Sequence, residues 1–134
     1  MNRVVVDTDV VSFLFKGDTR SEFYGQHLSG KQCIISFMTL AELYRWALVG
    51  RWGEKRKVKL EEHLKQFAVH PFNAKLCKIW AEVSFAARQS GYPIETADAW
   101  IAATALYHEI ALVTHNKSHY RGVSRLVVIS ELGT

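Results

Sequence analysis

The feature that most constrains the fold is an apolar run near the N-terminus, Val4–Val6, which leads directly into Asp7, Thr8 and Asp9. An unbroken run of β-branched residues predicts a strand that is buried on both faces, as in a parallel sheet covered by helices. In open α/β sheets, ligands bind just beyond the carboxyl ends of such strands. We therefore expect the first strand to deliver Asp7 and Asp9 to the edge of the sheet that binds ligands.

Short apolar runs alternate with helical patterns along the rest of the chain. Strands are predicted over Val4–Val6, Cys33–Ser36, Phe67–His70, Leu112–Thr114 and Leu126–Ile129. Helices are predicted over Val10–Phe15, Arg20–Leu28, Thr39–Val49, Glu54–Gln66, Asn73–Ser90 (with Asn73 as the cap) and Thr96–His108. This alternation predicts an α/β fold with a central parallel sheet of about five short strands and helices on both faces. The length of 134 residues fits a single domain over residues 1–134.

The cysteines and the apolar segments indicate the compartment. The chain has two cysteines, Cys33 and Cys77, and both lie in apolar segments, which predicts buried thiols rather than a disulfide. Free thiols suit a reducing cytoplasm. We expect no signal peptide, because Asp7 and Asp9 interrupt the N-terminal apolar stretch. The longest apolar run, within Ala99–Ala105, is far too short to span a membrane.

Several acidic residues lie at the predicted starts of helices, and each has an ordinary structural explanation. Asp7 can cap the helix that follows the first strand, and an acid such as Asp98 in a first turn suits the helix dipole. Thr39 and Glu42 have the spacing of a capping box, in which the glutamate reaches back to the backbone of the threonine. Taken singly, none of these residues requires a function.

Taken together, Asp7, Glu42 and Asp98 are harder to explain structurally. They lie near the starts of three different helices, and in a parallel sheet such starts share the carboxyl edge. Two like charges about 4 Å apart repel by about 1 kcal/mol in water and about 4 kcal/mol near a protein surface. A bound divalent cation would offset this cost, and hard oxygen ligands favour Mg²⁺ or Mn²⁺. His115 and His119 follow a strand without a third soft ligand nearby, so zinc is not expected.

The basic residues give a less specific signal. A net charge of +4 and a pI near 9.2 permit a polyanionic partner but do not require one. Many lysines and arginines lie in Arg45–Lys65, where a solvated helix face is the ordinary explanation. Arg45 and Lys117 lie nearest in sequence to candidate site residues, Glu42 and Asn116, and we expect these two to contact a phosphate backbone.

Four segments together resemble the motifs of PIN-domain ribonucleases, namely Val4–Asp9, Thr39–Leu43, Ile94–Leu106 and Leu112–Tyr120. Their order, their spacing and the total length are similar to those of the VapC-type toxins of bacterial toxin–antitoxin pairs. The resemblance covers nearly the whole chain. The third and fourth segments together are its most specific part, whereas the first alone is weak.

The resemblance implies an endoribonuclease in which Asp7, Glu42 and Asp98 hold Mg²⁺ or Mn²⁺ and Asn116 completes the catalytic site. It also implies an RNA substrate, a homodimer and a cognate antitoxin that blocks the cleft. Many family members have an Asp where this chain has His119, so we expect one firmly held ion and a second that arrives with RNA. Supporting roles are expected for Thr8, Asp9, Thr114 and His119.

Two other functions are compatible with parts of the pattern. The run from Asp7 to Val11 also resembles the first motif of haloacid-dehalogenase-like phosphatases, in which the first Asp is a nucleophile. That alternative leaves Glu42 without a role. A second alternative is a catalytically weak PIN-like module that binds RNA or protein, which the neutral Asn116 and His119 would suit.

Overall fold

Parallel strands form the centre of the structure, a computed structural model that describes residues 2–131. The strands of this part of the chain are β1 (Arg3–Val6), β2 (Gln32–Ser36), β3 (Ala68–His70), β4 (Leu112–Val113) and β5 (Val128–Ile129). Their order in the sheet is β3-β2-β1-β4-β5, and each neighbouring pair is parallel. The chain thus builds the sheet outward from β1 to β3 and then crosses to the other side of β1. Such a reversal leaves a crevice at the carboxyl ends of the strands.

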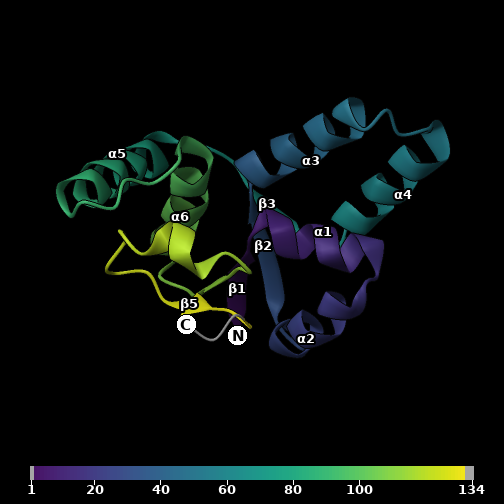
Figure 1. The fold of residues 1–134 in the computed structure, drawn as a ribbon, viewed down its shortest axis with the longest axis horizontal. Coiled ribbons are helices and arrows are strands. Elements are labelled where there is room, and N and C mark those ends of the chain that lie inside the picture. Colours follow the sequence, from purple (N-terminus) through teal and green to yellow (C-terminus); the bar gives the residue numbers. More distant parts are fainter. Residues whose placement is uncertain (1, 132–134) are drawn as a thin grey trace.

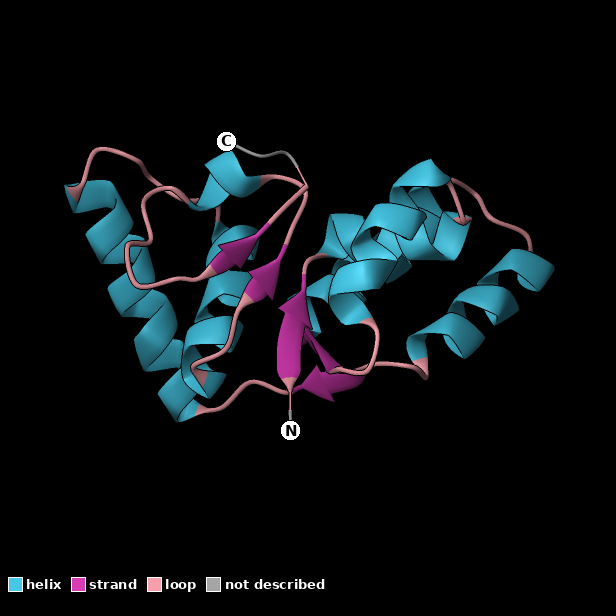
Figure 2. Cartoon of the chain, turned by 90° about the horizontal axis from the view of Figure 1, so that it is seen from below, coloured by secondary structure: helices cyan, strands magenta, loops and turns pink. Residues whose placement is uncertain are grey.

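Helices cover both faces of this sheet, as the sequence predicts. They are α1 (Thr8–Lys16), α2 (Thr19–Leu28), α3 (Phe37–Val49), α4 (Glu54–Leu64), α5 (Ala74–Gln89) and α6 (Thr96–His108), with a short 3₁₀ helix, η1 (Lys117–Tyr120). Figures 1 and 2 show α5 and α6 on one side of the strands and α1 to α4 on the other. The predicted α/β class with helices on both faces is therefore confirmed.

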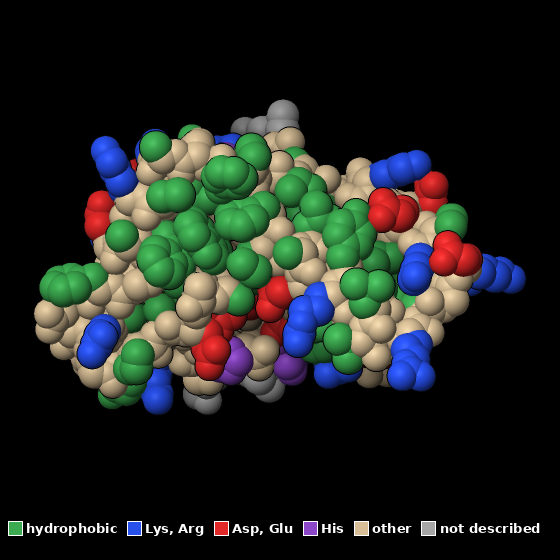
Figure 3. All heavy atoms as spheres, turned by 90° about the horizontal axis from the view of Figure 1, so that it is seen from above, with side chains coloured by type: hydrophobic (Ala, Val, Ile, Leu, Met, Phe, Trp, Pro, Cys, Tyr) green, Lys and Arg blue, Asp and Glu red, His purple; other side chains and the backbone are tan. Residues whose placement is uncertain are grey.

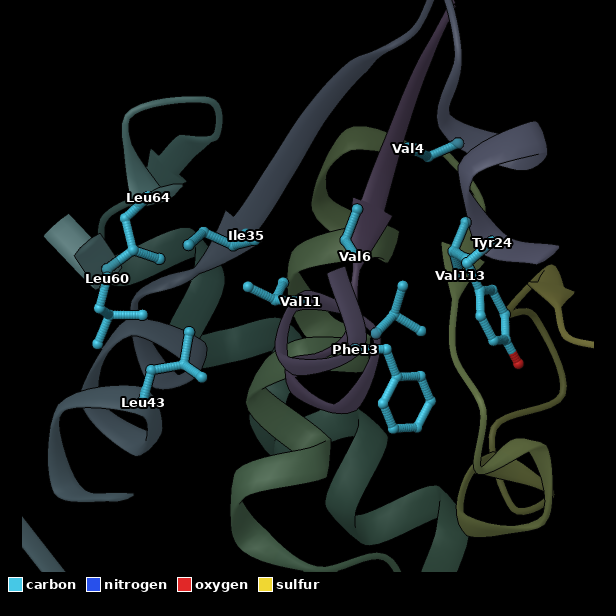
Figure 4. Packing of buried hydrophobic residues seen from close by; sticks show 11 residues of the cluster. Val4, Val6, Val11, Phe13, Tyr24, Ile35, Leu43, Leu60, Leu64 and Val113 are labelled. Atoms are coloured by element: carbon cyan, nitrogen blue, oxygen red, sulfur yellow. The ribbon is translucent and has the colours of Figure 1, made fainter. Parts of the chain in front are cut away.

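The alternation of side chains along β1 divides the core between the two faces. Val4 and Val6 pack in one apolar cluster with Leu43 of α3, whereas Val5 packs in a second cluster with Ile101 of α6. Figure 4 shows Val6 beside the α1 helix, and Leu43 of α3 grouped with Leu60 and Leu64 of α4. Full burial of an aliphatic side chain contributes about 1.5–3 kcal/mol. These contacts fix β1, and with it the acids that follow, at the centre of the molecule.

The start of α3 differs from the expected one. The helix begins at Phe37 and is capped by Ser36, whose Oγ accepts a hydrogen bond from the Met38 backbone N–H at 3.0 Å. Thr39 therefore lies inside the helix and is fully buried. The capping-box explanation for Glu42 is wrong, because the helix is capped by Ser36, three residues before Thr39.

Two further sequence predictions require correction or refinement. Cys33 is partly buried and Cys77 is exposed, and both are free, so the prediction of two buried thiols is wrong for Cys77. The buried side of α5 carries Leu76, Val83 and Ala87, which turns Cys77 outward.

The 3₁₀ helix η1 was not expected, because a single short turn carries no periodic pattern. None of the helices in residues 2–131 is both long and apolar enough to cross a lipid bilayer.

Gly122 follows η1 and packs directly against the loop after α5. A Cβ at this position would lie 2.3 Å from the backbone oxygen of Tyr92 and 3.0 Å from the Cβ of Ala87.

We expect Gly122→Ala to destabilise the protein by about 1–3 kcal/mol or more, the usual range for overpacking. Gly25 is the matched control, because a Cβ there meets nothing within 4 Å in the middle of α2. Gly25→Ala should stabilise by about 0.5–1 kcal/mol in the same urea titration. Equal midpoints for both variants would contradict the tight approach at Gly122.

Candidate active site

A cleft of about 600 Å³ opens at the carboxyl edge of the sheet, beside β1. Figure 3 shows acidic side chains and histidines gathered in this hollow, next to a wide apolar surface. The cleft is built from the start of α1, the middle of α3, the loop and first turn of α6, and η1. Its lining includes Asp7, Thr8, Asp9, Glu42, Trp46, Tyr92, Glu95, Asp98, Asn116, Ser118, His119 and Arg121. All four predicted catalytic residues therefore share one cleft.

Asp7 lies at the base of the cleft, because β1 ends directly before it. It caps α1 through Oδ1, which accepts a hydrogen bond from the Thr8 backbone N–H at 2.7 Å. Its Oδ2 accepts hydrogen bonds from the hydroxyls of Thr114 at 2.7 Å and Tyr120 at 2.8 Å. The Asp7 side chain is nearly fully buried. The capping role and the site role thus belong to the same carboxylate.

Glu42 reaches the cleft through the hydroxyl of Thr8. The Thr8 Oγ1 donates a hydrogen bond to Glu42 Oε1 at 2.8 Å and lies 2.9 Å from the hydroxyl of Thr39. A hydroxyl has one proton and a carboxylate accepts only, so Thr39 is the donor to Thr8. This chain of hydroxyls joins α3 to α1 and fixes the orientation of Glu42.

Asp98, in the first turn of α6, faces Asp7 across the hydroxyl of Tyr120. The Tyr120 Oη lies 2.8 Å from Asp7 and 3.4 Å from Asp98. The other oxygen of Asp98 lies 3.3 Å from His119 Nδ1. Tyr120 and His119, both from η1, therefore hold the two aspartates in a common arrangement.

Asp9 and Asn116 contact each other at the rim of the cleft. The Asn116 Nδ2 donates to Asp9 Oδ2 at 2.8 Å, and the same oxygen accepts from the His115 backbone N–H at 3.2 Å. The Asn116 backbone N–H donates to the Thr114 hydroxyl at 3.0 Å. Thr114 thereby bridges Asn116 to Asp7. Thr8, Thr114 and Asn116 thus form a connected network around Asp7 and Asp9.

The cleft strongly disfavours negative charge. Burial raises the pKa of Asp7 above its ordinary value, although hydrogen bonds from Thr114 and Tyr120 oppose this. Burial and repulsion from Asp7 raise the pKa of Asp9 to about 7. Burial, together with repulsion from Asp7, also raises the pKa values of Glu42 and Asp98. The charge of Asp7 therefore makes ionisation of the other three carboxylates more costly.

The chemistry of this donor set fits a divalent cation. Carboxylate oxygens are the ligands that Mg²⁺ and Mn²⁺ prefer, and a dication would relieve the repulsion between the acids. Within residues 2–131, however, no three His, Cys, Asp or Glu side chains converge as a ready-made metal site. The arrangement therefore fits an ion that keeps several water ligands, as Mg²⁺ usually does, better than an ion enclosed by protein.

The basic residues nearest the acids are not those singled out from the sequence. Arg45 is exposed on α3 and does not line the cleft, and Lys117 lines a neighbouring hollow on the other side of η1. Arg121 lines both hollows, and its guanidinium lies 4.4 Å from the centre of the Tyr92 ring. Arg121 is thus better placed than Arg45 or Lys117 to meet an anion in the cleft.

Sequence reasoning missed two tyrosines that hold the site together. Tyr120 is buried and joins Asp7 to Asp98. Tyr24 of α2 is fully buried, and its hydroxyl lies 2.7 Å from His115 Nδ1. Tyr120 is the last residue of the Leu112–Tyr120 motif, and its place in that motif is the sequence signal that could have identified it as a site residue. Tyr24 lies in a helix without any motif, and no sequence signal identifies it.

Comparisons with known proteins bear on the family and the fold of the chain. The family model described as "PIN domain" matches residues 4–123. "Ribonuclease VapC1" of Haemophilus influenzae (strain R2866) is 27% identical over 124 residues, which cover 91% of this chain and 92% of that protein. VapBC2 from Rickettsia felis, solved bound to a DNA fragment from its promoter, aligns with a TM-score of 0.83 at 23% identity, over 96% of this chain and 98% of that one. A toxin–antitoxin complex from Klebsiella pneumoniae aligns with a TM-score of 0.75 at 20% identity, over 95% and 96%.

Proposed function

The chain belongs to the PIN domain family and is related to VapC toxins, and from this premise we propose that it is a metal-dependent endoribonuclease acting as the toxin of a toxin–antitoxin pair. One observation carries the proposal: Asp7, Asp9, Glu42 and Asp98 line a single cleft, in which burial raises the pKa of each and repulsion from Asp7 raises the pKa of the other three. A relative of similar length is named as a ribonuclease, which supports RNA as the substrate.

Asp7 and Asp98 would hold Mg²⁺ or Mn²⁺, with Glu42 and Asn116 as further ligands or as partners of its water molecules. Such an ion supplies a bound water of lowered pKa and stabilises negative charge on a phosphate. Tyr120 keeps Asp7 and Asp98 facing the same point through its single hydroxyl. Such preorganisation avoids the cost of rearranging the charges when the reaction takes place.

The remaining residues position the RNA and handle protons. Thr8 fixes the Glu42 side chain through a hydrogen bond to Oε1. We propose the other carboxylate oxygen, Oε2, as the acceptor of the proton from the attacking water. Arg121 and His119 line the cleft and would contact the phosphate backbone. The match to the PIN family favours this mechanism over the haloacid-dehalogenase-like phosphatase.

The proposal is tested by incubating the protein with a 5′-labelled single-stranded RNA in Mn²⁺, in Mg²⁺ or in EDTA. We expect internal cleavage products with either metal ion and intact RNA in EDTA. A homogeneous preparation that binds Mn²⁺ but yields no product from several unrelated RNAs would contradict the proposal. That result would instead favour the non-catalytic PIN-like module.

We further propose a homodimer, supported by a wide apolar face beside the cleft (Figure 3). A row of aromatic contacts, which runs from Phe72 through Phe37 and Trp100 to Trp80, also supports it, with ring centres 6.0, 5.3 and 5.1 Å apart. Phe72 is 69% exposed. Contiguous apolar surfaces of this kind usually mark a protein interface.

Sedimentation velocity tests the dimer. The wild type should sediment as a dimer, and Phe72→Glu should shift it towards the monomer, because a charge would be buried at the interface. Val127→Glu is the control, since Val127 is 64% exposed but precedes β5 and is not part of the aromatic row. A monomeric wild type, or an equal shift in both variants, would contradict the assignment.

A cognate antitoxin is the remaining proposed partner. It is supported by the structural neighbour that is described as a toxin–antitoxin complex. An antitoxin that covers the acidic cleft would exclude RNA from Asp7 and Asp98 without altering either residue. Together with an RNA substrate, this partner fits an activity in the cytoplasm.

A further inference from the structure

A second hollow, of about 430 Å³, lies between the end of α1 and the first half of α4. It is lined by Phe15, Lys16, Lys55, Arg56 and Lys59, and we refer to it as the basic groove. No acidic side chain is among the described residues that line it. The groove thus combines a concave shape with a single sign of charge, the arrangement that concentrates an anionic ligand.

The lysines of the basic groove have little compensation from acids of the protein. The charge of Lys16 contributes to lowering the pKa of Asp18, but these two side chains do not form an ion pair. Within residues 2–131, no carboxylate forms an ion pair with Lys16, Lys55 or Lys59, although other lysines of α4 do pair with glutamates. Lys55 and Lys59 are four residues apart on one helix, and like charges at this spacing oppose helix formation. The juxtaposition of Lys55 and Lys59 therefore opposes folding, whereas it favours the binding of a polyanion.

An aromatic stack adjoins the charged side chains. The rings of Phe15 and Trp52 are nearly parallel, with an angle of 12° and 5.6 Å between centres. The Arg56 guanidinium lies over the Trp52 ring at 3.9 Å. Flat aromatic and guanidinium surfaces beside a positively charged groove are the features with which proteins bind single-stranded nucleic acids.

The α1 helix links the basic groove to the acidic cleft. Asp9 lines the cleft and Lys16 lines the groove. These residues are seven apart and lie on the same face of α1, separated by about 10 Å at 1.5 Å per residue. Between them in sequence, the Phe13 ring carries the Arg20 guanidinium at 3.7 Å. At about 3.4 Å per nucleotide of a helical strand, this distance corresponds to about three nucleotides.

We propose that the basic groove is a second binding site for single-stranded RNA, holding the backbone about three nucleotides from the phosphate in the acidic cleft. This inference rests on the proposed ribonuclease function. RNA is a better fit than an acidic protein segment, because the planar Arg56 guanidinium, held over the Trp52 ring, can stack on an unpaired base. The path along α1 also ends at the proposed catalytic acids. Lys16, Lys55 and Lys59 bind phosphates, and Trp52 with Arg56 supports a base.

The test is fluorescence anisotropy with a labelled single-stranded RNA, using Asp98→Asn protein so that the RNA stays intact. The groove variant is Lys55→Ala/Lys59→Ala, and the matched control is Lys78→Ala/Arg88→Ala, which removes two exposed positive charges from α5. Each phosphate contact to a single strand contributes about fivefold in affinity at 0.1 M salt, so the groove variant should bind up to about 25-fold more weakly. Its slope of log affinity against log salt should shrink by about 1.4.

The outcomes separate the groove from the proposed function. The groove variant should melt at no lower a temperature than its parent, which excludes a merely structural effect. Its loss of RNA affinity should be greater for RNA that is long enough to reach both the basic groove and the acidic cleft. If the wild type cleaves RNA but the groove and control variants bind alike, the groove inference is overturned and the function stands. If the wild type neither binds nor cleaves RNA, both fall. Weaker binding of polyglutamate with unchanged RNA affinity would identify a protein-docking surface and overturn the inference.

Discussion

Replacement of Asp98 by Asn is expected to lower the rate of metal-dependent RNA cleavage by at least about 100-fold, the scale of losing one preorganised charge at a reaction centre. The amide keeps the shape of the side chain but cannot supply an anionic ligand. Burial and repulsion from Asp7 raise the pKa of Asp98, so its charge opposes folding in the absence of metal. We therefore expect the variant to be at least as stable as the wild type in EDTA. Initial cleavage rates and urea titrations measure the two effects.

The matched control for Asp98→Asn is Glu22→Gln. Glu22 is likewise an acid in the first turn of a helix, in this case α2, but it is exposed and lies outside the cleft. If Asp98 serves only the dipole of α6, both variants should lose a few tenths of a kcal/mol and neither should lose activity. Unimpaired cleavage by Asp98→Asn would therefore rule out the proposed mechanism.

The second large effect is stabilisation by Mn²⁺ that grows with pH. Asp9 has a pKa of about 7 in the folded protein, well above that of an ordinary aspartate. A raised carboxyl pKa means that the folded state holds a proton which the unfolded state has lost. The resulting stability is complete below the unfolded pKa of about 4 and disappears as the pH rises through about 7. The metal-free protein should therefore become less stable over this range.

A divalent ion should reverse this loss, because it replaces the protons among the carboxylates. At a free concentration of 100 times its Kd, Mn²⁺ should stabilise the protein by roughly 2.7 kcal/mol. Thermal unfolding at pH 5 and pH 8, in EDTA and in Mn²⁺, measures the effect, which should be larger at pH 8. Asp9→Asn should flatten the pH dependence in EDTA. Identical unfolding midpoints with and without Mn²⁺ at pH 8 would exclude a metal site in the cleft.

The fold was predictable from sequence because its signals are local. The β-branched run Val4–Val6 and the wholly apolar helix Thr96–His108 each specify one element without knowledge of the rest, and α6 has the predicted bounds. The alternation of such elements then allows few topologies. The ends of weaker elements were less predictable, since the start of α3 depends on the cap at Ser36, and short strands such as β4 end where their neighbours stop pairing.

The acids of the site were also predictable, because helix starts after parallel strands share one edge of the sheet. The groups that orient them were not. Tyr120 reaches Asp7 from a position 113 residues later in the sequence, and Thr8 reaches Glu42 over 34 residues. A hydroxyl in a buried segment looks the same in sequence whether it bonds a carbonyl or a catalytic acid. Arg121 was overlooked for a related reason, since proximity in sequence favoured Arg45 and Lys117 whereas the path of η1 places Arg121 in the cleft.

The position of β1 has a consequence for synthesis of the protein on the ribosome. β1 is made before the other strands of residues 2–131, yet it lies between β2 and the late strand β4, and Asp7 accepts hydrogen bonds from Thr114 and Tyr120. A nascent chain that has not yet reached Tyr120 lacks both the neighbour that closes the sheet and the groups that orient the first acid. We therefore expect the acidic cleft to reach its final geometry only after Tyr120 has been synthesised. For the proposed ribonuclease, we expect this order of assembly to keep an incomplete chain from cleaving RNA close to the ribosome.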